Sequence, residues 1–136
     1  MATASKGAHF PSFDNGLDKN RALHPFKSLV KSGVVTCGGS DCPIEPIDPL
    51  LGVWAAVTHG MVPQERLSVD EAIRMYTFNA AFASGEEKIK GTIESGKLAD
   101  LTVLSQDPYD VGPNDIKDIS VEMTIVDGEV VYARKC

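Results

Sequence analysis

The sequence lacks any apolar run near the roughly 18 residues that a membrane-spanning helix needs. Its first residues also lack the charged-then-apolar pattern of a signal peptide, so we expect a cytoplasmic protein. Basic residues are few, with 13 Lys and Arg against 19 Asp and Glu and a net charge of −6. This balance argues against nucleic acid or an anionic membrane as partner, because both bind basic surfaces. The three cysteines, Cys37, Cys42 and Cys136, show no repeating spacing, which predicts reduced thiols and no disulfide framework.

The composition is that of one folded domain. Of the 136 residues, 43% are hydrophobic and 24% are charged, which lies in the range of globular proteins. A chain of this length can bury its own core. Residues 1–20 have little hydrophobic periodicity, so they are predicted to be a flexible arm or loop.

The first half of the chain has the pattern of an α/β protein. A helix is predicted in ALHPFKSLVKSG, with Pro25 at its first position and Gly33 just after its last turn. The following VVTC, residues 34–37, is short, β-branched and uncharged, which predicts a buried strand. A helix followed by a buried strand is the repeating unit of parallel α/β folds.

Two further helices are predicted by their end signals. Asp48 and Pro49 can cap and begin a helix that runs through LLGVWAAVTH and ends at Gly60. Ser68 is followed three residues later by Glu71, a capping box that begins a helix up to Gly85.

From about residue 90 the pattern changes to strands. GTI at 91–93, ADLTVL at 99–104 and ISVEMTIVDGEVVYA at 119–133 are predicted strands, and Asp127-Gly128 predicts a two-residue hairpin turn. The acidic stretch NDIKD at 114–118 is predicted to be a solvated turn. One helix–strand unit cannot close a parallel barrel, which needs about 250 residues. The sequence therefore resembles the last portion of a larger fold.

Asp41 is the candidate functional residue. It lies in VVTCGGSDCPIEPIDP, where a predicted strand ends in two glycines and is followed by a proline-rich loop. A carboxylate at the end of a strand is a common position for a catalytic group, but a turn or cap Asp would have the same neighbours. Cys37 and Cys42 flank it and could suggest a metal site. We favour a buried strand thiol and a loop thiol, because no second cysteine pair accompanies them.

Four stretches, in this order, resemble the C-terminal end of the amidohydrolase superfamily, in particular amidohydrolase family 3. The first, residues 24–58, resembles the last barrel helix and strand with the proline-rich loop. RLSVDEAIRMYTFNAAFAS resembles the helix after the barrel. GTIESGKLADLTVLSQDP and VEMTIVDGEVVY resemble the return into a small β-sandwich and its closing hairpin.

The resemblance implies an α/β fragment, namely the last helix–strand unit of a (β/α) barrel plus helices, followed by part of a β-sandwich. The implied boundaries are an arm at 1–20, the end of the barrel with its following helices at 21–88, and sandwich strands at 89–136. The family hydrolyses amide-like C–N bonds of small molecules with divalent metals, zinc being the ion we expect. By this resemblance Asp41 would be metal ligand and general base, and Ser40, Cys42 and Pro43 would shape the mouth of the substrate site.

The family's remaining metal ligands have no counterpart in this sequence. It contains no His-x-His, and His9, His24 and His59 do not match the family's ligand positions. The resemblance thus predicts that the isolated chain is inactive, binds no catalytic metal tightly and forms a homo-oligomer. The alternative is a non-catalytic oligomerisation or regulatory module derived from an amidohydrolase.

Overall fold

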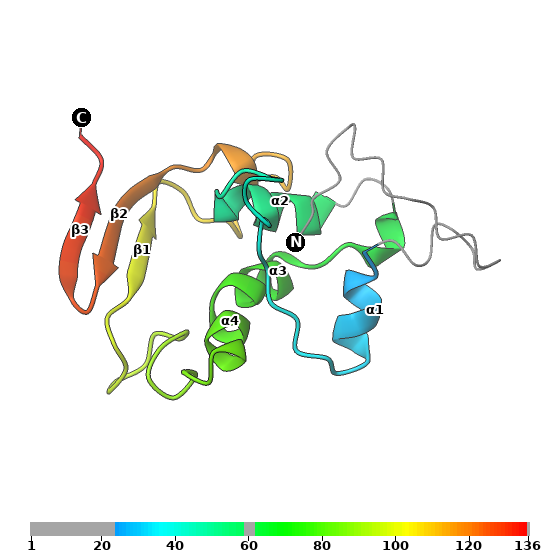
Figure 1. Ribbon diagram of the computed structural model, residues 1–136. Helices are drawn as coiled ribbons and strands as arrows, with labels where there is room; N and C mark the ends of the chain where they lie inside the picture. The colour runs from blue at the N-terminus through cyan, green and yellow to red at the C-terminus, as the bar shows by residue number, and fades with distance from the viewer. Residues whose placement is uncertain (1–23, 59–61, 136) are drawn as a thin grey trace.

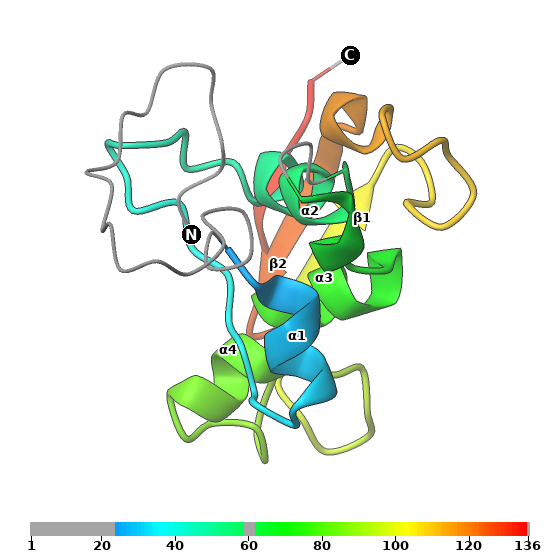
Figure 2. The ribbon, with the colours of Figure 1, turned by 90° about the vertical axis from the view of Figure 1, so that its right-hand side faces the viewer.

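The computed structural model describes residues 24–58 and 62–135 and divides them into a helical part and a small sheet (Figures 1 and 2). The predicted arm at 1–20 and the helix end at His59 and Gly60 lie outside these residues. Throughout the described ranges, no helix is long and apolar enough to cross a membrane. The elements are α1 (Phe26–Lys31), α2 (Pro49–Thr58), η1 (Pro63–Glu65), α3 (Val69–Tyr76), α4 (Phe78–Ala83), β1 (Leu101–Leu104), η2 (Ile116–Asp118), β2 (Val121–Val126) and β3 (Glu129–Ala133).

The ends of α1 and α2 follow from local sequence. Pro25 caps α1 one residue before the first helical position, and Gly33, at φ +81°, donates its N–H to Val30 O at 3.0 Å. In α2 the side chain of Asp48 accepts a hydrogen bond from Leu50 N–H at 2.9 Å, and Pro49 is the first helical residue. Both predicted helices are confirmed, with a one-residue shift at Pro25.

The third predicted helix is divided in two. The capping box of Ser68 and Glu71 begins α3, and the left-handed Gly85 follows the end of α4. Between them the backbone of Thr77 leaves helical geometry, with φ −122° and ψ −99°. Thr and Asn have low helix propensity, and Thr77 and Asn79 both lie at this break.

The core lies between the helices. Met75 of α3 and Ile116 of η2 are the largest fully buried side chains. Ile116 lies within the acidic stretch predicted to be a solvated turn, so that prediction is wrong for this residue, although the charged neighbours are exposed. The buried cluster consists of Val53, Ala56, Val57, Leu67, Ala72, Met75 and Ile116.

The sheet is antiparallel with the order β1-β2-β3. Leu101 of β1 pairs with Ile125, and Val126 pairs with Glu129 across the hairpin. The two turn residues, Asp127 at φ 50° and Gly128 at φ 82°, are both left-handed, as a type I′ turn requires. The predicted closing hairpin is confirmed (Figure 1), and every residue of β3 is exposed.

Two predicted strands are absent from the described part of the chain. VVTC forms no strand, with Val34 and Val35 about half exposed, and GTI forms no strand, with Ile93 89% exposed. A strand needs a neighbour for its N–H and C=O groups, and the predicted parallel neighbours do not occur among the described residues. The helix–strand unit predicted at 24–37 is therefore present only as its helix.

Candidate functional site

Asp41 lies on the turn that follows the irregular segment 34–40. Its φ of 54° is left-handed, a conformation in which Asp is among the better tolerated residues. Its carbonyl accepts a hydrogen bond from Ile44 N–H at 2.9 Å, and its carboxylate is exposed. Asp41 is thus an exposed residue of a turn closed by a backbone hydrogen bond.

The other predicted site residues lie on the same turn. Ser40 is half-buried, and Cys42 and Pro43 are exposed. Cys37 and Cys42 are both free and exposed, so the prediction of a buried thiol at Cys37 is wrong. The reason is the missing strand pairing, which leaves residue 37 at the surface.

The described residues alone do not fit a divalent metal. A catalytic zinc site uses three protein ligands, and nowhere in residues 24–58 and 62–135 do three His, Cys, Asp or Glu side chains gather as such a set. Asp41 offers one carboxylate. His9 and His59 lie outside the described residues.

The segment before Asp41 is held by the ends of α3 and α4. Gly38 N–H donates to Met75 O at 3.0 Å, and Asn79 Nδ2 donates to Thr36 O at 2.8 Å in a half-buried hydrogen bond. The ring of Tyr76 packs so closely on Gly38 that a Cβ there would lie 2.5 Å from two ring carbons. No local sequence pattern marks these contacts, although Thr77 and Asn79 inside a predicted helix indicate an interruption.

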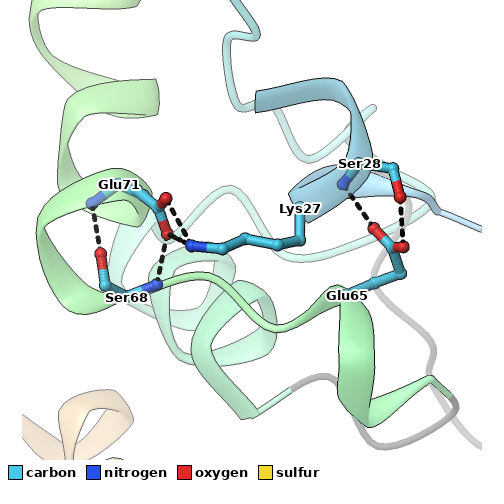
Figure 3. Close-up of polar contacts among 5 residues, drawn as sticks. All are labelled: Lys27, Ser28, Glu65, Ser68 and Glu71. Atoms are coloured by element: carbon cyan, nitrogen blue, oxygen red, sulfur yellow. Dashed lines mark hydrogen bonds and ion pairs between the residues drawn. The ribbon is translucent and has the colours of Figure 1, made fainter. Parts of the chain in front are cut away.

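A second polar group joins α1 to η1 and α3 (Figure 3). Lys27 Nζ lies 2.5 and 2.6 Å from the two carboxylate oxygens of Glu71. Ser28 donates its N–H and hydroxyl to Glu65 at 2.8 and 2.6 Å. These contacts fix the helix that precedes the segment 34–40.

Burial by itself would raise the pKa of Glu71, but other interactions outweigh it. Hydrogen bonds from Lys27 and Ser68 and the charge of Lys27 hold the pKa of this carboxyl below its ordinary value. Glu71 is therefore ionised at neutral pH and makes a charge-assisted contact that ties α1 to α3.

Comparison with known proteins identifies the family. The family model described as "Amidohydrolase family" matches residues 2–132. The N-substituted formamide deformylase of Arthrobacter pascens is 38% identical over 118 residues, which is 82% of this chain and 22% of that protein.

Solved structures agree with this relationship. An amidohydrolase from Thermotoga maritima MSB8 superposes with a TM-score of 0.64 and 30% identity, over 78% of this chain and 25% of that one. A metal-dependent hydrolase from Pyrococcus horikoshii OT3 gives 0.63 and 30%, over 70% and 21%. The chain thus spans about a quarter of the length of the proteins it matches. It belongs to the amidohydrolase family.

Proposed function

We propose that this chain supplies the C-terminal portion of a metal-dependent, cytoplasmic amidohydrolase that hydrolyses amide-like C–N bonds of small molecules. Family membership and the share of the relatives that the chain spans support this proposal. In it, residues 21–88 belong to the end of the barrel with its following helices, and residues 89–136 to the sandwich. The relative named as an N-substituted formamide deformylase supports an amide-like substrate.

Asp41 is the proposed general base. The observation that carries this role is an exposed carboxylate on a left-handed residue, in a turn that follows an anchored segment. Backbone conformations of this kind collect at functional sites. The carboxylate would accept a proton from the water that attacks the carbonyl carbon, and the proton would pass to the leaving nitrogen as the C–N bond breaks.

The residues around Asp41 have proposed roles in substrate and metal binding. Ser40, Cys42 and Pro43 shape the mouth of the substrate site beside Asp41. Asp41 is also the proposed metal ligand, with zinc as the expected ion. Its other ligands must come from outside the described residues, because those residues do not form a set. The isolated chain is accordingly proposed to be inactive.

A chimera tests the role of Asp41. The matching segment of the Arthrobacter pascens deformylase is replaced by this chain, and hydrolysis of an N-substituted formamide is measured. Asp41→Asn keeps the size of the side chain but removes the base, so kcat should fall at least about 10²-fold. Asp127→Asn is the matched control, because Asp127 is also a left-handed turn aspartate, at φ 50°.

Two results would contradict the proposal. If Asp41→Asn retains most of the activity, the carboxylate has a structural role. If the chimera folds but is inactive before any substitution, the chain cannot replace the C-terminal portion of the hydrolase. The non-catalytic module is then favoured. Cys42→Ser should leave the rate nearly unchanged.

A further inference from the structure

We propose that the break between α3 and α4 positions Asp41, with Asn79 and Tyr76 as positioning residues. This inference rests on the proposed function, because it concerns the same carboxylate. It concerns residues that lie far from Asp41 in sequence and that no catalytic role has yet included.

The break makes a backbone acceptor available. In an unbroken helix the carbonyl of Met75 would accept the N–H four residues later. The non-helical backbone at Thr77 separates α3 from α4, and Met75 O instead accepts Gly38 N–H at 3.0 Å. The segment 34–40 is therefore hydrogen-bonded to the C-terminal end of α3. In a sheet, the same Gly38 N–H would instead bond to a neighbouring strand.

Asn79 supplies the second backbone contact. Its Nδ2 donates to Thr36 O at 2.8 Å, so backbone groups on both sides of Cys37 are bonded to the α3–α4 region. The hydroxyl of Thr36 is buried with no hydrogen-bond partner among the described residues. Such a group is unfavourable, and the two backbone contacts offset its burial.

The ring of Tyr76 packs the segment against α2. A Cβ on Gly38 would lie 2.5 Å from the ring, and a Cβ on Gly52 would lie 1.8 Å from the phenolic oxygen. The ring therefore fills the space between two glycines, one in the segment and one in α2. Burial raises the pKa of the Tyr76 hydroxyl, which accordingly stays neutral.

These contacts end close to the proposed base. Only Gly39 and Ser40 separate Gly38 from Asp41, whose turn closes through the hydrogen bond from Ile44 N–H to its carbonyl. A shift of about 1 Å in a catalytic group can lower a rate on the order of 10²-fold. Loss of the Asn79 contact should therefore displace Asp41 and lower the reaction rate.

Amide hydrogen exchange of the full 136-residue chain tests the contact directly. In Asn79→Ala, exchange at Gly38 N–H should become about threefold to tenfold faster, because one supporting hydrogen bond is lost. Asn114→Ala is the matched control, in an exposed loop, and should change nothing at Gly38. Unchanged exchange at Gly38 in a folded Asn79→Ala protein would overturn the proposal.

Kinetics of the chimera test the consequence. Asn79→Ala should lower kcat at least about tenfold with little change in KM, and Asn79→Gln, which keeps an amide donor, should recover part of the loss. If Asp41→Asn abolishes activity and Asn79→Ala has no effect, positioning is refuted and the proposed function stands. If Asp41→Asn has no effect, the proposed function fails, and the exchange data still decide whether the contact orders the segment.

Gly38→Ala provides a second variant that leaves α3 and α4 unchanged in sequence. The added methyl meets the Tyr76 ring, so both exchange near residue 38 and kcat should change as in Asn79→Ala. Tyr76→Leu added to Gly38→Ala should relieve the contact and restore part of the rate. A Gly38→Ala protein with unchanged exchange and unchanged kcat would refute the role of Tyr76.

Discussion

Glu71 stabilises two elements through one carboxylate. It completes the capping box of α3 by accepting Ser68 N–H at 2.7 Å, and it accepts hydrogen bonds from Lys27 of α1 (Figure 3). The capping contact satisfies a backbone donor that α3 itself cannot pair. Protonation of this one group would weaken both the start of α3 and the docking of α1.

The pH dependence of stability follows from the lowered pKa of Glu71. Its folded-state pKa lies below the ordinary value of 4.5, so its contribution is present above that pH and is lost as the pH falls through the folded-state pKa. Glu71→Gln should lower stability at pH 7 by about 1 kcal/mol and should flatten the decline of stability below the ordinary pKa of 4.5. Urea unfolding at several pH values measures both effects. If stability depends on pH in the same way in the wild type and in Glu71→Gln, the prediction is wrong. Glu129→Gln is the control, because Glu129 is exposed.

Gly52 is predicted to be intolerant of alanine although it lies inside α2. Alanine favours helices, but its Cβ would lie 1.8 Å from the Tyr76 hydroxyl. Because the ring is held on its other side by Gly38, Gly52→Ala should destabilise the protein by about 1–3 kcal/mol. Thermal unfolding checks this, and added Tyr76→Phe should recover part of the loss. A stabilised Gly52→Ala protein would show that the ring moves freely.

At the scale of elements, the β2–β3 hairpin depends on its turn. A Cβ on Gly128 would meet no atom within 4 Å, so Gly128→Ala tests backbone conformation alone. At φ 82° this substitution should cost about 1–2 kcal/mol, whereas Asp127→Asn should be nearly neutral because Asn-Gly also forms type I′ turns. Urea unfolding of both variants measures these losses of stability. Equal losses for Gly128→Ala and Asp127→Asn would contradict the prediction.

Elements with local signals could be predicted from the sequence. The capping box at Ser68, the Asp48 cap and the Asp127-Gly128 turn each act within a few residues, and each is confirmed. The strand at VVTC could not be predicted correctly, because its pairing depends on neighbours that are absent from the described residues. The burial of Ile116 likewise depends on α2, far away in sequence.

The candidate site was predictable to the same extent. The turn at Asp41 follows from its Gly, Ser and Pro neighbours, which are local. Asn79, whose side chain bonds to Thr36 O in the segment 34–40, is 43 residues from Thr36 in the sequence. No local sequence pattern predicts this contact. The helix break at Thr77, which makes the contact possible, is visible in the sequence only as two weak helix formers.

At the scale of the whole molecule, the sheet leaves apolar side chains uncovered. Val130 and Val131 of β3 are 57% and 61% exposed, and β3 is an outer strand. We propose that a second copy of the chain covers this region, with two-fold symmetry as the commonest closure. Light scattering across a dilution series should show a dimer or larger species at micromolar concentration.

Substitutions distinguish association through β3 from non-specific hydrophobic association. Val131→Lys should shift the chain toward monomer, because it places a charge on the exposed strand. Ile93→Lys is the matched control, since Ile93 is an exposed apolar residue outside the sheet. A wild-type chain that stays monomeric at all concentrations would contradict self-association and would favour an independently folded module.

The isolated chain is expected to lack hydrolase activity. Its described residues offer no set of metal ligands, and no His-x-His occurs in the sequence. The purified chain is assayed with added Zn²⁺ or Mn²⁺ on N-acyl amino acids and cyclic amides. Turnover that depends on the metal, above a chelated control, would show that the missing ligands are supplied within the chain or between copies.

The burial of Ile116 connects the sheet with the helical part of the chain. The connection from β1 to β2 passes over α2, and Ile116 is buried there against α2 residues including Val53 and Val57. In Figure 1 the three strands lie to one side of the helices, and η2, in the connection from β1 to β2, contacts α2. The packing of Ile116 therefore joins the sheet to α2, the helix whose Gly52 receives the ring of Tyr76.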